Sequence, residues 1–456
     1  FPPRAAAQSD MRVASASPTR FVFSRASYHA SRRWRAPPRL ASAVPRKRTA
    51  RLARRGSDFD SAPEKPPVTR MASAASSGDH SASDDAPSSP TDLAGIQAYV
   101  RSSPLWTQLR LDDASLTDTV VAHWGQVSTT LCKHLGLASD ALTPDESDRV
   151  YRYYLPTYLW CVGRIDAHRT RELRENKNKT PTALVVGLSA PQGCGKTTLA
   201  AALAFCLTQN EFNVANVSLD DVYLTGQEQD VMAATNPNNE LLRFRGNAGT
   251  HDVGLAVAVL KKLRGGHGGG ESSVNKNIPL PRYDKTLRNG RGDRAPVDEW
   301  PLVETPVDVV LFEGWMLGFE PVSDDEVCGK IHRDLKSVNE KLRGGGYDEM
   351  HGLIDDWLVI KVGDFSWVTK WRLEQEQFAR AAGKNTLSDK QVVDFVRRFI
   401  PAYALYGKQM YASLPRRGPW VRTGREGEHA QGVFVVQVDE TRRVVGGSDK
   451  QEDEYR

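Results

Sequence analysis

The chain has 456 residues, of which 39% are hydrophobic and 26% are charged, and its formal net charge is +5. This length is sufficient for more than one domain with a sizeable core. No apolar stretch approaches the length that spans a bilayer. The five cysteines are widely spaced and form no CxxC pair, which argues against a disulfide framework and a structural zinc site.

The first 94 residues differ in composition from the rest. Residues 1–70 carry a net charge of +12, so the remaining chain is acidic at −7, and we expect no nucleic-acid partner for it. Residues 1–55 contain 14 basic residues and one acid, Asp10, among many Ala and Ser. This composition predicts an organelle transit peptide; the alternative is a basic disordered arm that binds nucleic acid or membrane. Residues 56–94, rich in Ser, Ala, Asp and Pro, are predicted to form a linker.

The start of translation is open, because the sequence begins with Phe1 rather than Met. A start at Met11 would include the transit-like segment. A start at Met71 would omit it, and we would then expect a cytoplasmic product.

Residues 95–175 are predicted to form a small helical subdomain. Apolar and aromatic residues recur there at helical spacing, and we expect them to form a core rather than a ligand site. They are Tyr99, Leu105, Trp106, Leu109, Val120, Trp124, Leu131, Leu135, Val150, Tyr153 and Tyr154.

Residues 189–198, Ser-Ala-Pro-Gln-Gly-Cys-Gly-Lys-Thr-Thr, are predicted to form a phosphate-binding loop. An apolar run at 183–188 precedes them as a strand, and helix-forming residues follow at 199–207. The N–H groups from Gln192 to Lys196 are expected to bind phosphate oxygens. The residues expected to contact the nucleotide are Gln192, Gly193, Cys194, Gly195, Lys196, Thr197 and Thr198.

The loop departs from the strict pattern G-x-x-x-x-G-K-[ST], because Ala190 stands where the first glycine is usual. The alternative interpretation is a glycine-rich surface turn that contains a lysine. Cys194 is interpreted as a small residue in the loop, with a thiolate of low pKa at the helix N-terminus as the alternative.

Four further apolar runs, at 214–219, 307–312, 357–362 and 433–438, alternate with helical segments. This alternation predicts an α/β fold, with a mostly parallel sheet flanked by helices, over residues 176–445. Ligands of such sheets collect at the carboxyl ends of the strands.

Carboxylates stand at two of these strand ends. Glu313 is a candidate Mg²⁺ partner beside the Thr197 hydroxyl, because a carboxylate after a buried strand needs water or a metal. Asp220 is a candidate to orient an acceptor hydroxyl group and accept its proton, while Lys196 stabilises the transferred phosphoryl group. The alternative for Asp220 and Asp221 is helix N-capping.

Two polar segments, 243–252 and 281–294, have the composition of a site for a small anion, because arginine forks bind carboxylate and phosphate. The alternative is a pair of solvated surface loops. The candidate substrate residues are Tyr223, Arg245, Asn247, His251, Tyr283 and Arg294.

Residues 371–380 are predicted to form a charged helix from which Arg372 reaches the nucleotide, with an ordinary surface helix as the alternative.

Residues 332–339, His-Arg-Asp-Leu-Lys-Ser-Val-Asn, match the catalytic loop of protein kinases. The supporting motifs are absent from the sequence: there is no G-x-G-x-x-G-x-V loop, no V-A-I-K strand and no A-P-E. We therefore predict an exposed helix with alternating charges here.

The motifs together resemble those of the P-loop small-molecule kinases, which include uridine kinase, pantothenate kinase and phosphoribulokinase. The resemblance is most specific to the plant-type D-glycerate 3-kinases, over about residues 95–440. Its marks are the phosphate loop, Leu-Asp-Asp-Val-Tyr-Leu-Thr at 219–225, Arg-Gly-Asn-Ala-Gly-Thr-His-Asp at 245–252, Gly-Arg-Gly-Asp-Arg at 290–294, Phe-Glu-Gly-Trp at 312–315 and Phe-Val-Arg-Arg-Phe-Ile-Pro-Ala-Tyr at 395–403.

The resemblance implies phosphorylation of D-glycerate to 3-phospho-D-glycerate with ATP and Mg²⁺, in photorespiration within the chloroplast stroma. The residues alone predict only a kinase of a small hydroxyl compound, with a small-molecule partner and no membrane partner. The alternatives are another acceptor, such as a nucleoside or pantothenate, and a switch that binds ATP without catalysis. The sequence does not indicate an oligomeric state.

Overall fold

The computed structural model describes residues 92–111, 116–175, 180–265, 277–323, 325–383, 386–414 and 432–446. The predicted transit peptide and nearly all of the predicted linker, over residues 1–94, therefore lie outside the described residues.

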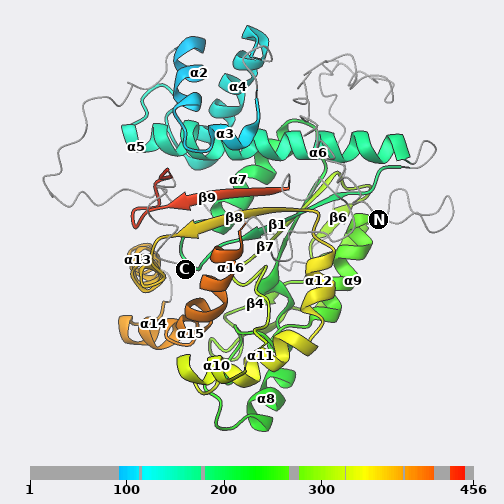
Figure 1. The fold of residues 1–456 in the computed structure, drawn as a ribbon, viewed down its shortest axis with the longest axis vertical. Coiled ribbons are helices and arrows are strands. Elements are labelled where there is room, and N and C mark those ends of the chain that lie inside the picture. Colours follow the sequence, from blue (N-terminus) through cyan, green and yellow to red (C-terminus); the bar gives the residue numbers. More distant parts are fainter. Residues whose placement is uncertain are drawn as a thin grey trace, which may run out of the picture.

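A five-stranded parallel sheet forms the centre of the fold (Figure 1). Its order is β2-β7-β1-β8-β9, and all four neighbouring pairs run parallel. The strands are β1 (Leu184–Ser189), β2 (Val214–Ser218), β7 (Val309–Gly314), β8 (Asp356–Val362) and β9 (Val433–Val438). All five predicted strands are confirmed, and so is the predicted α/β fold class.

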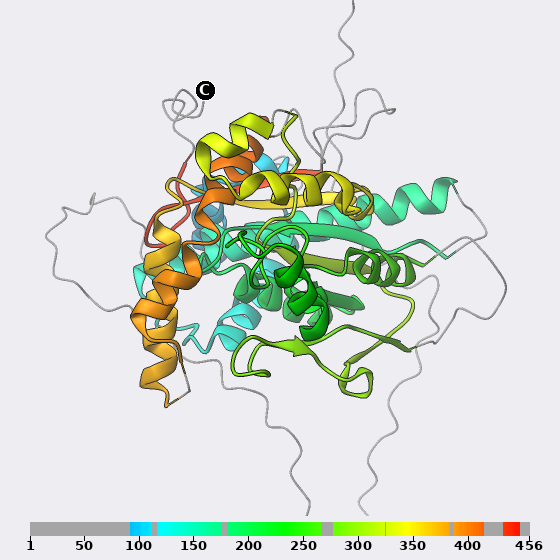
Figure 2. The same ribbon diagram turned by 90° about the horizontal axis from the view of Figure 1, so that it is seen from below.

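Helices cover both faces of the sheet. The chain passes outward from β1 through α7 (Lys196–Gln209) to β2, then turns back through α9 (Val253–Arg264) to β7. Right-handed crossovers in opposite directions place these two helices on opposite faces. The later helices share the face of α9, as Figure 2 shows for α10 (Asp325–Ile331), α11 (Leu335–Gly344), α12 (Tyr347–Gly352) and α16 (Lys408–Ser413).

Helices α13 (Trp367–Ala381), α14 (Asp389–Val396) and α15 (Ile400–Ala402), with the π-helical turn η5 (Tyr403–Gly407), complete the connection from β8 to β9. In Figure 1, α13 and α14 lie beside the carboxyl ends of the strands. These elements therefore border the edge of the sheet at which the phosphate loop begins.

The predicted helices of the N-terminal region are present. They are α2 (Leu93–Arg101), α3 (Trp106–Leu109), α4 (Asp118–Leu135), α5 (Pro144–Ser147), η2 (Asp148–Tyr154) and α6 (Leu155–Glu175). Their apolar residues continue the core of the sheet: Trp160 stacks on Phe434 with ring centroids 5.1 Å apart. The Gln108 amide also hydrogen-bonds to the backbone N–H and C=O of Val435 on β9.

Shorter elements follow β2 and form one wall of the site. A 3-10 turn, η3 (Leu219–Val222), leads into α8 (Gly226–Thr235). Farther along the chain lie two small antiparallel pairs. One joins β3 (Asn277–Pro279) to β6 (Leu302–Glu304), and the other joins β4 (Tyr283–Asp284) to β5 (Asp293–Arg294), with the turn η4 (Val297–Glu299) between β5 and β6.

The structure corrects the expectation for residues 332–339. They form a turn and the first half of α11, and two of their polar side chains are buried rather than exposed. Asp334 accepts a hydrogen bond from the N–H of Glu240, and Asn339 bonds to the backbone of Val322 in both directions. These two side chains therefore hold α11 against other segments of the chain. Across the described residues, no helix is both long enough and apolar enough to cross a membrane.

Candidate functional site

The phosphate loop is the turn between β1 and α7, and two glycines allow its shape. Gly193 and Gly195 have φ angles of 81° and 96°, which side chains rarely adopt. A Cβ atom on Gly193 would also lie 2.6 Å from the Cβ atom of Trp371 on α13. The loop is therefore packed directly against this helix.

Gln192 differs from expectation, whereas Cys194 has the environment of a small buried residue. The N–H of Gln192 donates to the Tyr403 hydroxyl at 3.1 Å, whereas it was expected to face a phosphate group. The Cys194 thiol donates to the carbonyl of Pro191, and burial raises its pKa to about 11. Cys194 is thus a buried thiol, and its raised pKa does not favour the alternative of a thiolate.

Glu313 connects the carboxyl ends of β1, β2 and β7. The register pairs it with Leu188 of β1 and Ser218 of β2, so its carboxylate lies between the two neighbouring strands. One oxygen accepts from Thr197 at 3.2 Å and from Ser218 at 3.0 Å. The other lies 3.3 Å from the Lys196 ammonium group. The carboxylates of Glu313 and Asp220 raise the pKa of Lys196, although burial opposes them.

Asp220 lies next to this cluster on η3. Its carboxylate accepts from the Tyr223 hydroxyl at 2.9 Å and pairs with Lys285 at 2.6 Å. Although burial opposes them, the charges of Lys285 and Lys196 hold the pKa of Asp220 well below its usual range. The group is therefore ionised throughout the neutral range of pH. It does not cap η3, because the Ser218 side chain fills that position.

Asp221 points to a different part of the chain. It pairs with Arg282 at 2.9 Å and accepts from the N–H of Tyr283 at 3.2 Å. Burial raises its pKa. Asp221 thus anchors the β4–β5 hairpin against η3, and it does not make the helix N-cap that was the alternative for it.

Tyr223 and His251 form the next layer of the site. Their rings stack with centroids 4.7 Å apart, and His251 Nδ1 bonds to the Tyr347 hydroxyl at 2.9 Å. Burial lowers the pKa of His251 to about 4, so the ring is neutral near pH 7. Its Nε2 atom is buried without a hydrogen-bond partner in the described structure.

The other predicted substrate residues gather around Tyr223. The Tyr283 ring contacts it edge-on at 5.3 Å, and the Arg245 guanidinium lies over the Tyr283 ring at 5.5 Å. Arg294 donates to the Tyr223 carbonyl and pairs with Asp252 at 3.0 Å. The two polar segments predicted as an anion site are therefore brought together.

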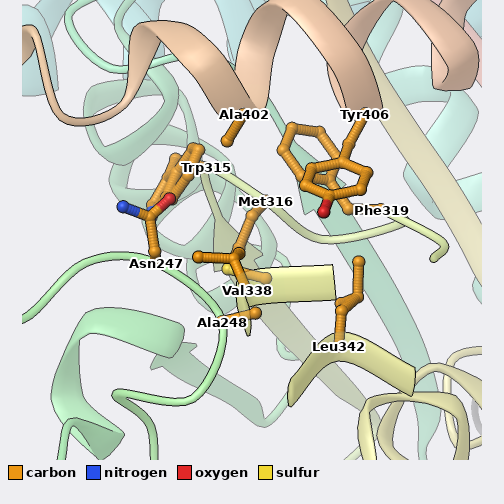
Figure 3. A pocket seen from close by; sticks show the side chains of 9 residues that line it. All are labelled: Asn247, Ala248, Trp315, Met316, Phe319, Val338, Leu342, Ala402 and Tyr406. Carbon is orange, nitrogen blue, oxygen red and sulfur yellow. The ribbon is translucent and has the colours of Figure 1, made fainter. Parts of the chain in front are cut away.

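Asn247 is buried, and its side-chain N–H₂ group donates to the carbonyls of Leu241 and Arg398. In Figure 3 its amide points toward the Trp315 ring, on one side of a small pocket. The remaining lining is mainly apolar and comprises Ala248, Met316, Phe319, Val338, Leu342, Ala402 and Tyr406. The Asn247 carbonyl oxygen and the Trp315 N–H are both buried without a partner in the described structure.

Arg372 and Arg442 lie on the α13 side of the loop. The predicted Arg372 pairs with Glu376 at 2.8 Å and bonds to Gln375, so these hydrogen-bond partners lie on its own helix. Arg442, which the sequence analysis missed, donates to the Gly193 carbonyl at 2.9 Å. No motif marks Arg442, because it follows β9 in a turn far along the chain from the loop.

The arrangement combines a loop that fits phosphate groups, an ionised carboxylate at the next strand end and a wall rich in arginine.

No family model matches the chain. The chain is 37% identical to "D-glycerate 3-kinase, chloroplastic" of Arabidopsis thaliana over 350 residues, which cover 76% of this chain and 72% of that protein.

The chain is also 33% identical to "Probable ATP-dependent kinase TDA10" of Saccharomyces cerevisiae, over 51% of this chain and 80% of the relative. A solved structure of D-glycerate 3-kinase from Cryptococcus neoformans superposes with a TM-score of 0.53 at 30% identity. The match covers 64% of this chain and 97% of that structure's chain.

Proposed function

The chain belongs to the D-glycerate 3-kinase family, and we propose that it transfers the γ-phosphoryl group of ATP to the 3-hydroxyl group of D-glycerate. The product is 3-phospho-D-glycerate. The observation that carries the proposal is the ionised carboxylate of Asp220 beside Lys196, at a strand end that faces the arginine-rich wall. A protein that only bound ATP would not need a carboxylate at this point.

The phosphate loop is proposed to bind ATP, with Lys196 against the transferred phosphoryl group. Transfer of that group depends mainly on positioning and on stabilisation of charge. Asp220 would accept a hydrogen bond from the acceptor hydroxyl and hold its oxygen in line with the phosphorus atom. Because its pKa is depressed, Asp220 is a weak base, and we expect it to take the proton late in the reaction.

Mg²⁺ fits the oxygen donors at this site. Thr197 and Ser218 both donate to one oxygen of Glu313, and the other oxygen is buried 3.3 Å from the Lys196 ammonium group. Hard cations of this kind prefer such hydroxyl and carboxylate oxygens together with phosphate oxygens. We propose that Thr197 and Glu313 hold the ion, which would neutralise phosphate charge when it is bound.

The proposal is tested by measuring ADP release by the purified enzyme with D-glycerate, L-glycerate, glycerol, uridine and pantothenate. We expect turnover with D-glycerate and a product that phosphoglycerate kinase accepts, which identifies the 3-phosphate. Turnover with a nucleoside or pantothenate alone would assign a different acceptor. ATP binding without turnover of any acceptor would favour a switch protein.

We also propose that the enzyme acts in the chloroplast stroma, in photorespiration. The support is the chloroplastic designation of the Arabidopsis relative and the excess of basic residues at 1–55. A fluorescent fusion of residues 1–94, started at Met11, should enter plastids, whereas a product started at Met71 should stay in the cytoplasm. Uniform cytoplasmic fluorescence from the longer fusion would contradict the proposal.

A further inference from the structure

Arginine and phenylalanine side chains alternate in a stack between α13 and the segment 243–252. The Arg372 guanidinium lies 5.7 Å from the Phe395 ring centroid, and Arg398 lies 5.6 Å from the same ring. Arg398 also lies 4.6 Å from the Phe244 ring, which Arg243 approaches to 5.6 Å. Three cations are thus held beside one another by two aromatic rings.

Arg398 occupies the middle of this stack with little compensating charge. Its side chain is 15% exposed, and among the described residues its acidic partner is Asp394 at 3.4 Å. Asp394 is 51% exposed and is also bound by Arg397 at the shorter distance of 3.0 Å. Burial and the neighbouring arginines lower the pKa of Arg398, although Asp394 opposes them. A bound anion would therefore stabilise the buried charge of Arg398.

Arg245 is one of the arginines whose charge acts on Arg398, and it also borders the reaction centre. It lies over Tyr283, which contacts Tyr223, whose hydroxyl donates to Asp220. Its hydrogen bonds to two backbone carbonyls, of Gly290 and Arg291, both use one terminal nitrogen. Within the described chain it makes no ion pair, so its remaining N–H groups have no carboxylate partner.

We propose that Arg398 and Arg245 bind the carboxylate of the acceptor and thereby direct its hydroxyl group toward Asp220. This inference rests on the proposed function and adds the residues that recognise the acid. A planar guanidinium group matches a carboxylate in a two-bond geometry, which suits a small acid better than a neutral polyol. ATP has separate partners in the loop N–H groups and Lys196, so the stack is assigned to the acceptor.

The test compares Arg398→Gln with the parent enzyme on D-glycerate and on D-glyceramide, its uncharged analogue. Loss of charge-assisted hydrogen bonds to a carboxylate should raise KM for D-glycerate about 10- to 100-fold. KM for ATP and kcat/KM for D-glyceramide should stay within about twofold of the parent, because neither uses the lost contact. Arg397→Gln is the matched control, since its side chain is 60% exposed and shares Asp394, and we expect near-parental kinetics.

An Arg398→Lys variant covers the case in which Arg398→Gln unfolds, because it keeps the positive charge and loses only the two-bond geometry of the guanidinium group. Arg398→Lys should raise KM for D-glycerate less than Arg398→Gln does. An equal loss on both acceptors, no loss, or a rise in KM for ATP would overturn the inference. If the parent enzyme fails to turn over D-glycerate, the proposed function itself is refuted, whereas normal Arg398 variants with an active parent refute only this assignment.

Discussion

Asp220 and Asp221 are adjacent in the sequence, but their carboxylates bond to different parts of the site. Asp220 meets Tyr223 and Lys285 beside the phosphate loop, whereas Asp221 holds Arg282 and the hairpin backbone. Successive residues of a tight turn point in different directions, so one carboxylate can serve chemistry while its neighbour supports a wall. The two substitutions should therefore have separable effects.

Asp220→Asn should reduce kcat about 100- to 10,000-fold, because it removes the group that orients the acceptor hydroxyl and accepts its proton. The dissociation constant of ATP should change little, since the phosphate loop and Glu313 are untouched. Single-turnover phosphoryl transfer at saturating ATP and D-glycerate measures the effect. Transfer at close to the parental rate would show that positioning and charge stabilisation proceed without this carboxylate.

Asp221→Asn should instead leave kcat nearly unchanged and raise KM for D-glycerate less than about fivefold, as expected when a partly exposed ion pair is lost. The amide oxygen can still accept from the N–H of Tyr283, and Lys285 of the hairpin still pairs with Asp220 of η3. Steady-state kinetics of both variants side by side provide the comparison. A larger fall of kcat for Asp221→Asn than for Asp220→Asn would reverse the assignment of the two carboxylates.

At the scale of elements, the strands and the phosphate loop were predictable because their signals are local. Each strand is a continuous apolar run, and the loop lies between the first run and a helix. The partners of Arg372 and the role of Arg442 were not predictable, because they depend on how α13 and the turn after β9 meet the loop. The same holds for Asp334 and Asn339, whose burial arises from contacts with distant segments.

Arg442 should hold the phosphate loop in place through the Gly193 carbonyl and α13. Its guanidinium bonds to the Gly193 carbonyl, pairs with Glu374 on α13 at 2.9 Å and lies 5.1 Å from the Trp371 ring centroid. Arg442→Ala should therefore weaken ATP binding about 5- to 30-fold, the effect of one lost charged hydrogen bond. Calorimetric titration with ATP measures it, and Arg443→Ala, at an exposed neighbour, is the control. Unchanged ATP affinity in the Arg442 variant would show that the loop keeps its shape without this contact.

At the scale of the whole molecule, burial lowers the pKa of the three buried histidines, His168, His251 and His351, and most strongly that of the last two. Burial lowers the pKa of both His251 and His351 to about 4. His351 Nε2 accepts from the N–H of Gly318, and His251 stacks on Tyr223, so each ring is fixed in a neutral state within the fold. An unfolded chain would carry both rings at their ordinary pKa of about 6.5. The unfolded state therefore binds more protons than the folded state between these two values.

The free energy of unfolding should consequently fall as the pH is lowered from 7 to 5.5. Each histidine contributes about 1 kcal/mol of this loss, so the pair accounts for about 2 to 3 kcal/mol. Carboxyl groups whose pKa is raised by burial, such as Asp356, act in the opposite sense. Urea unfolding at pH 7, 6 and 5.5 measures the dependence, and a His251→Gln/His351→Gln double variant should flatten it. A slope that is the same in the parent and the double variant would show that other groups control the acid sensitivity of the fold.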